Sequence, residues 1–117
     1  MTETITVPYR GAGTIEEGRK YIKGCVGPGW GPLLDRLVDD LLELGWNGKL
    51  LQVKEKFGGL RFYTTWETDR MSTRINQAEE ESYRTCEHCG SPGEARGSGW
   101  ISIRCNSCYK KERGMDY

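Results

Sequence analysis

Histidine is almost missing from this sequence, because His88 is the only one among 117 residues. A serine-histidine-acid triad therefore has one possible base, and a nuclease site needs a histidine base together with further histidine or carboxylate metal ligands. The remaining residues do not supply such a set. We expect no catalytic site and no small-molecule substrate, and a protein that acts by binding.

Long apolar runs and an excess of one charge are missing as well. No segment approaches the roughly 18 apolar residues of a membrane span, and residues 1–10 lack the apolar run of a signal peptide. Basic and acidic side chains are equal in number, 17 of each, so the overall charge favours neither nucleic acid nor a membrane surface as a partner. We expect a cytoplasmic protein without a membrane partner.

The apolar content is low for a folded domain. Only 36% of the residues are apolar and 29% are charged, and the length is that of one domain or of one domain with a small added module. Chains with a modest core gain from a metal ion or a cross-link. A structural metal site would therefore suit this composition.

Two C-x-x-C pairs near the end of the chain supply such a site. C-E-H-C-G begins at position 86 and C-N-S-C at position 105, which gives the spacing C-x2-C-x15-C-x2-C of a four-cysteine zinc site. In a reducing compartment this spacing favours metal ligation over disulfides. Four ligands leave no open position for a reactive water, so the predicted zinc ion is structural. Its expected ligands are Cys86, Cys89, Cys105 and Cys108.

The residues around these cysteines predict a treble clef or a zinc ribbon. Gly90 permits the bend of a zinc knuckle, a hairpin can turn near residues 97–99, and a short helix can begin within the second pair. We expect Trp100 in the return strand of that hairpin. His88 is expected to be exposed or to act behind the ligands, although it could replace Cys89 as a ligand. Cys25 fits a small buried side chain better than a reactive thiol.

The pattern before residue 86 predicts a small helix and β-hairpin domain. The overall expectation is an α+β fold, with residues 1–85 forming that domain and residues 86–117 forming a zinc module docked on it. Glycine at positions 11 and 13 is expected to break the chain, and residues 24–32 to form a glycine and proline loop. Capping signals, three- and four-residue apolar spacing and alternation predict the following elements: a strand at 4–7, helices at 14–23, 32–44 and 69–84, and a hairpin of strands 49–57 and 60–66 turning at Gly58-Gly59.

Two charged surfaces are candidate binding sites. The helix at 32–44 has an acidic outer face, and the central hairpin has four basic residues against one acidic residue. Lysine, arginine and aromatic side chains together can hold phosphates and stack bases. The competing interpretation is a solvated face whose cations pair with the acidic helices. The acidic candidates are Asp35, Asp39, Asp40 and Glu43, and the basic candidates are Lys54, Lys56, Arg61 and Tyr63, with Lys110 and Lys111 near the end.

Several segments resemble an uncharacterised family of small bacterial and phage or prophage proteins. These are C-V-G-P-G-W-G-P-L-L-D-R-L, Q-V-K-E-K-F-G-G-L-R-F-Y, A-E-E-E-S-Y-R-T-C-E-H-C-G-S-P-G and W-I-S-I-R-C-N-S-C, and the likeness covers about residues 24–108. The resemblance implies phage biology and no particular activity. We therefore expect a phage-borne protein that binds a host protein or defence complex in the host cytoplasm, with the acidic face imitating nucleic acid. The alternative is a DNA- or RNA-binding protein that uses the basic hairpin and the zinc module.

Overall fold

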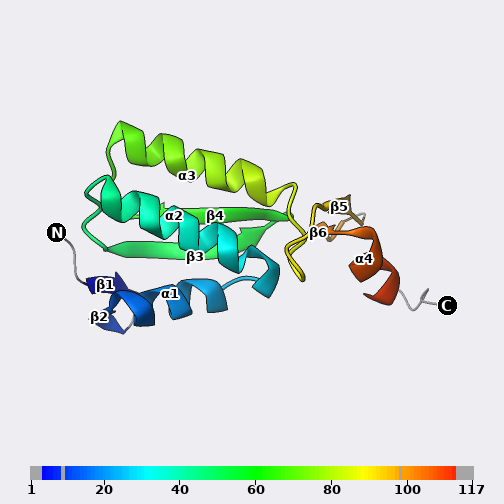
Figure 1. The fold of residues 1–117 in the computed structure, drawn as a ribbon, viewed down its shortest axis with the longest axis horizontal. Coiled ribbons are helices and arrows are strands. Elements are labelled where there is room, and N and C mark those ends of the chain that lie inside the picture. Colours follow the sequence, from blue (N-terminus) through cyan, green and yellow to red (C-terminus); the bar gives the residue numbers. More distant parts are fainter. Residues whose placement is uncertain (1–3, 9, 98, 113–117) are drawn as a thin grey trace.

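The computed structural model describes residues 4–8, 10–97 and 99–112. Within these residues the chain forms a small α+β fold of three two-stranded antiparallel hairpins and four α-helices (Figure 1). Figure 1 shows α2 and α3 side by side over the central hairpin, and the cysteine-containing segment at one end of the molecule. The elements are β1 (Thr4–Val7), β2 (Gly11–Thr14), α1 (Ile15–Gly24), α2 (Gly31–Glu43), β3 (Leu50–Lys56), β4 (Gly59–Thr64), α3 (Asp69–Ser82), β5 (Glu94–Arg96), β6 (Ser102–Arg104) and α4 (Asn106–Glu112).

The first hairpin contains a strand that the sequence pattern did not predict. Residues 11–14 pair with β1 in antiparallel register, so the expected break at Gly11 and Gly13 was wrong. A strand of glycine, alanine and threonine has no apolar alternation, and backbone pairing with β1 alone creates it. Thr14 then begins α1 with the predicted capping box: its hydroxyl accepts from the Glu17 amide at 3.0 Å, and Glu17 Oε1 accepts from the Thr14 amide at 2.9 Å.

The leucine-rich helix α2 follows a glycine loop that contains a short 3₁₀ turn at Pro28–Trp30. Its apolar face is buried, as the spacing predicted, through Leu33, Leu34, Leu37, Val38 and Leu41. The helix ends at the expected glycine, because Gly45 has φ +98° and donates to the carbonyl of Leu42 at 3.1 Å, while Trp46 donates to that of Leu41 at 2.9 Å. This is the Schellman arrangement, which needs the left-handed conformation that glycine adopts without strain.

The central hairpin has one face in the core and one face away from it. Val53 is paired with Phe62, and both side chains are buried against α2 and α3 together with Leu60. The turn residues are Phe57 and Gly58, one position earlier than the sequence suggested, and both have positive φ. The strand expected at 60–66 is shorter than predicted, because β4 ends at Thr64, and the Trp66 side chain beyond it is 52% exposed.

Helix α3 covers the outer edge of β4. The amide of Leu60 donates to the Ser82 hydroxyl at 2.9 Å, and the amide of Phe62 donates to Glu79 Oε2 at 3.0 Å. These bonds satisfy backbone groups that an edge strand would otherwise leave open to another chain. They also explain why Ser82 is buried on the inner face of α3, together with Met71, Ile75 and Ala78, whose spacing is that of one helical face.

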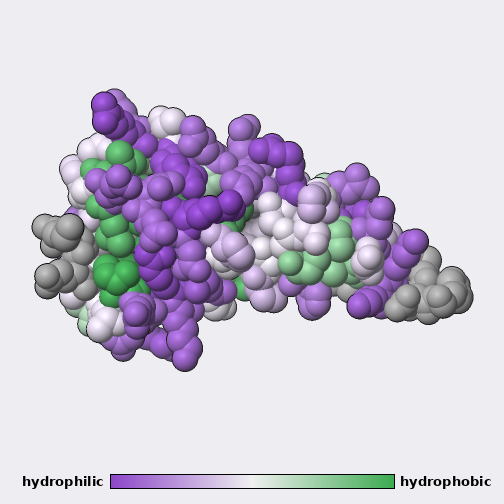
Figure 2. Space-filling view, in the orientation of Figure 1, coloured by the Kyte–Doolittle hydropathy of each residue, from purple (hydrophilic) through white to green (hydrophobic). Residues whose placement is uncertain are grey.

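The cysteine-containing segment is in direct contact with the rest of the fold. Ile103 of β6 is fully buried in the same hydrophobic cluster as the leucines of α2 and the hairpin residues. The surface that carries α2 and α3 is largely hydrophilic, as Figure 2 shows. No helix among the described residues has both the length and the apolar composition that a bilayer crossing requires.

Candidate metal centre and hairpin surface

Four cysteines from two turns meet at one point. Cys86 and Cys89 belong to the turn that follows α3, Cys105 directly follows β6, and Cys108 lies in the first turn of α4. Their Sγ atoms all lie within 4.8 Å of one another, and the Sγ atoms of Cys89 and Cys105 are 3.6 Å apart. This is the set that the spacing predicted. The arrangement can bind one metal ion through four sulfur ligands.

The local backbone explains why the first pair converges. The amide of Gly90 donates to the carbonyl of Cys86 at 2.9 Å, and Gly90 has φ +84°, so the chain folds back tightly after Cys89. This is the left-handed bend expected at that glycine. In the second pair, the Cys108 amide points at Cys105 Sγ at 3.4 Å, which suits an ionised sulfur.

The electrostatics of the cluster differ between its sulfurs. Hydrogen bonds from the side chain and backbone of Ser91 lower the pKa of Cys89 to about 6. Burial, with the neighbouring cysteine sulfurs, raises the pKa of Cys108 to about 12. Four closely spaced thiols do not ionise together easily, because each thiolate opposes the next. A divalent cation between them reverses that penalty, so the cluster has the chemistry of a cation site.

The glycine loop before α2 packs directly on this cysteine turn. The Gly29 amide donates to the carbonyl of Glu87 at 2.7 Å, and a Cβ on Gly29 would lie 2.0 Å from the carbonyl oxygen of Cys86. A Cβ on Gly27 would lie 2.4 Å from the carbonyl oxygen of Glu87. The glycines of G-P-G-W-G therefore permit close backbone approach. Sequence reasoning missed this role, because nothing local in the loop points to residues 58 positions away.

The remaining candidates near the centre are placed as follows. His88 is exposed, in line with the expectation, and the group of described residues that could hold a metal contains cysteines only. Glu87 is buried, and its Oε2 accepts from the Ile103 amide at 2.6 Å, which ties the first cysteine turn to β6. Cys25 is half-buried and donates to the carbonyl of Tyr21 at 3.3 Å, and burial raises the pKa of its thiol. Cys25 therefore has no feature of an activated thiol.

No protein-family model, curated protein or solved structure matches this chain. Its function is therefore inferred from its own residues.

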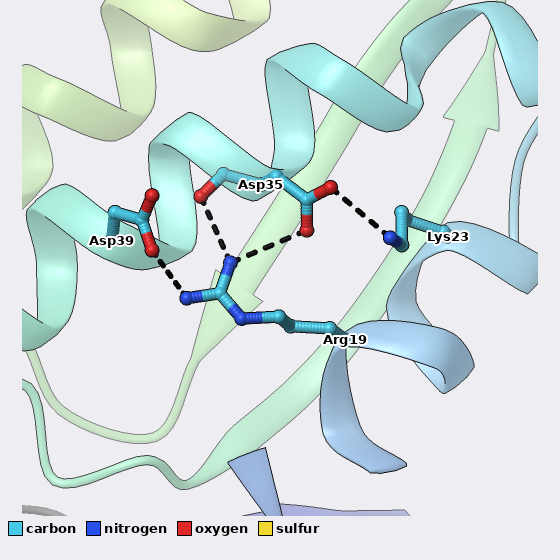
Figure 3. A network of polar contacts seen from close by, with 4 residues as sticks. All are labelled: Arg19, Lys23, Asp35 and Asp39. Carbon is cyan, nitrogen blue, oxygen red and sulfur yellow. Dashed lines mark hydrogen bonds and ion pairs between the residues drawn. The ribbon is translucent and has the colours of Figure 1, made fainter. Parts of the chain in front are cut away.

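The acidic face of α2 is largely occupied by cations of the neighbouring helices. Arg19 of α1 lies between Asp35 and Asp39 and bonds to both, and Lys23 Nζ is 3.0 Å from Asp35 Oδ2 (Figure 3). On the other side of α2, Arg74 of α3 pairs with Asp40 at 2.6 Å. Of the four acidic candidates, only Glu43 lacks an ion pair among the described residues. The negative charge that this face offers to a partner is correspondingly reduced.

The basic candidates lie together on the face of the hairpin that points away from the core. Lys54 is paired with Arg61, and Gln52 with Tyr63, so these side chains share one face, which Lys56 extends by alternation. The two lysines and Arg61 form no ion pair within residues 4–8, 10–97 and 99–112. Arg61 donates to the Tyr83 hydroxyl at 3.1 Å. The hydrogen bond with Tyr83 and, more weakly, the charge of Glu79 on α3 raise the pKa of Arg61, but among these residues no ion pair joins this face to the acidic helices.

Lys110 and Lys111 lie apart from the hairpin face, exposed on α4. The structure places two further side chains beside the hairpin that the sequence did not single out as a site. Phe57 at the turn and Trp100 before β6 are 65% and 81% exposed, and both line one cavity. Trp100 was expected inside a strand, but β6 begins only at Ser102. A tryptophan preceded by two glycines, Gly97 and Gly99, was the only sequence signal for this position.

Proposed function

We propose that this chain is a small zinc-stabilised protein that binds nucleic acid through the outer face of its central hairpin, without catalysis. One observation carries the proposal: Lys54, Lys56, Arg61 and Tyr63 share a face on which no cation forms an ion pair among the described residues. Cations that no internal carboxylate neutralises are available to phosphates, and an adjacent aromatic ring can stack on a base.

Zinc is the metal that the donor set favours. Four thiolates in a tetrahedral arrangement are typical of structural zinc, and at about 2.3 Å from the ion such sulfurs lie about 3.8 Å from one another. The 3.6 Å between the sulfurs of Cys89 and Cys105 is close to that separation. The order of cysteine turn, β5–β6 hairpin and α4 supports a treble clef, because the second pair stands at the beginning of a helix. We propose that this ion holds the segment after residue 85 on the helix and hairpin domain.

A protein partner on the acidic face is supported less well. Asp35, Asp39 and Asp40 already bind Arg19, Lys23 and Arg74, so imitation of nucleic-acid charge by this face would require those ion pairs to open. Surface ion pairs open at little cost, about 0–1 kcal/mol each, but the nearby cations would remain. A phage-borne protein acting on a host protein or defence complex therefore stays a prediction.

The test measures binding of fluorescein-labelled single-stranded and double-stranded oligonucleotides by anisotropy, at about 50 mM salt and at increasing salt. We expect binding that weakens with salt. Lys54→Glu should bind more weakly than the parent protein at the same salt concentration. It should also make the slope of log affinity against log salt concentration less steep, by about 0.7 for the single strand. The matched control is Lys20→Glu, which makes the same charge change at an exposed position of α1.

Comparison of the two variants distinguishes binding at the hairpin face from a general effect of net charge. Equal weakening by Lys54→Glu and Lys20→Glu would mean that only net charge matters, and the hairpin face would lose its assignment. Absence of binding to either oligonucleotide at about 50 mM salt would refute the proposed function. Zinc is tested separately by elemental analysis of the purified protein, in which one equivalent of zinc per chain is the expected result.

A further inference from the structure

The two most exposed large hydrophobic side chains among the described residues lie at the same place. Phe57 comes from the tip of the β3–β4 hairpin and Trp100 from the loop before β6, and both line a cavity of about 200 Å³. The other lining residues are Glu55, Lys56, Gly99 and Ile101. Neither ring contributes much to the core, because both are more than half exposed. Exposed apolar side chains that gather around a hollow mark a binding site.

The backbone at Phe57 indicates that its side chain is present for a purpose other than folding. Phe57 has φ +53° and Gly58 has φ +81°, as in the two-residue hairpin turns that favour Asn-Gly. A bulky residue in this conformation is an outlier, and asparagine would adopt it with less strain. The Phe57 ring is 65% exposed, so its contribution to the core does not account for an aromatic residue in this strained conformation.

The cavity is held by the contact between the hairpin and the cysteine segment. A Cβ on Gly58 would lie 3.1 Å from Ile101 Cγ2 and 3.4 Å from Ile103 Cδ1, so the hairpin tip rests directly on β6 and on the residue before it. Ile103 is fully buried, and β6 leads into Cys105. The cysteine centre therefore fixes the position of Trp100 relative to Phe57. A site held in this way is preorganised.

The charged side chains beside the cavity indicate which kind of ligand it can bind. Lys56 Nζ lies 5.7 Å from the centre of the Phe57 ring, and its side chain belongs to the same hairpin face as Lys54 and Arg61. The one carboxylate of the lining, Glu55, is engaged in the turn, since its Oε2 accepts from the Gly58 amide at 2.7 Å. Aromatic faces with adjacent cations suit a flat ring attached to phosphates. Bases in a duplex are stacked on each other and unavailable to such a site.

We propose that the cavity between Phe57 and Trp100 binds an unpaired base of a single-stranded nucleic acid, whose phosphates follow Lys56 and Lys54 along the hairpin. This inference rests on the proposed function and assigns its substrate class. It also gives the cysteine centre a role in binding, because the loss of that centre releases Trp100 from the hairpin tip.

The test compares variants for their affinity to a labelled oligothymidylate of about 12 nucleotides. Trp100→Ala and Phe57→Asn should each weaken binding about ten-fold, with the salt slope unchanged, because stacking releases no counterions. Trp100→Tyr should restore most of the affinity. Trp66→Ala is the matched control: Trp66 is also an exposed tryptophan, lies beyond the opposite end of β4, and should leave binding unchanged.

Thermal unfolding of the same variants separates binding from stability. Phe57→Asn should melt at the same or a higher temperature than the parent protein, since asparagine tolerates positive φ, while it binds more weakly. A melting temperature lowered together with the affinity would instead make Phe57 a structural residue and overturn its assignment as a stacking residue.

Three further results would overturn the inference. If Lys54→Glu weakens binding and Phe57→Asn and Trp100→Ala do not, the hairpin binds phosphates and the cavity plays no part, while the proposed function stands. Equal affinity for a duplex oligonucleotide would contradict the binding of an unpaired base in the cavity. A protein that is retained after nuclease treatment by the parent chain but not by Trp100→Ala would assign the cavity to a polypeptide partner.

Discussion

The indole Nε1 of Trp30 donates a hydrogen bond of 2.9 Å to the carbonyl oxygen of Thr85, which lies 55 residues further along the chain. This bond joins the loop before α2 to the residue that precedes Cys86, and Gly29 makes a second bond to the same turn through its amide. The buried tryptophan and the neighbouring glycine thus attach the cysteine turn to the helical part of the fold.

The first prediction concerns this attachment. Gly29→Ala should destabilise the protein by about 1–3 kcal/mol or more, because the new methyl group would overlap the carbonyl of Cys86. Gly24→Ala is the control, since a Cβ at that last position of α1 meets nothing within 4 Å. Urea unfolding of the two variants measures the difference. Similar midpoints for both would contradict the close packing at Gly29.

The second prediction concerns the metal ligands. Cys105→Ser should lose the metal and much of the folded signal, because metal binding and folding of such a centre are coupled. Cys25→Ser should retain the metal, since Cys25 lies outside the four-cysteine group. Elemental analysis and circular dichroism melts of both variants provide the measurement. Full metal content and an unchanged melting curve for Cys105→Ser would refute a structural centre.

The third prediction concerns pH. Thiolates bind the metal, so binding must remove the proton from Cys108, whose pKa is raised to about 12, whereas Cys89, with a pKa of about 6, is already ionised at neutral pH. Zinc affinity should therefore rise with pH, and at least one proton should be released at pH 7. Calorimetry in buffers of different ionisation enthalpy counts these protons. A heat of binding that does not depend on the buffer would contradict the prediction.

The fourth prediction concerns the beginning of α1. Thr14→Ala should cost about 1 kcal/mol, since it removes the cap of the first turn. Hydrogen bonds with Thr14, backbone first, lower the pKa of Glu17 below its ordinary value of 4.5, so the stabilisation from that carboxylate is complete above pH 4.5 and is lost as the pH falls further. Thr14→Ala keeps the backbone amide that donates to Glu17, so both proteins should lose this stabilisation in acid, whereas Glu17→Gln should not.

Urea unfolding at neutral and acidic pH measures this effect. Thr73→Ala, at an exposed interior position of α3, is the control and should cost nothing, because alanine is the better helix former. A parent protein whose stability falls in acid no more than that of Glu17→Gln would show that the Glu17 carboxylate does not contribute to the cap.

The sequence indicated the local features of this protein well. The apolar spacing predicted the inner faces of two helices, because a helical face repeats every three to four residues wherever the helix lies. These faces are Leu33, Leu37 and Leu41 in α2, and Met71, Ile75 and Ala78 in α3. Strand alternation likewise placed Lys54 and Arg61 on one face of the hairpin. The strand β2 escaped prediction, since its glycines carry no pattern and only pairing with β1 orders them.

The sequence by itself identified the four cysteines that could bind a metal ion, since each C-x-x-C pair converges through a turn of a few residues. Only the tertiary structure decided which charges remain available, because the pairing of Arg19 with Asp35 depends on how α1 packs against α2. It also decided that Phe57 and Trp100 share a cavity. Such contacts join residues that are far apart in the chain, and no local spacing encodes them.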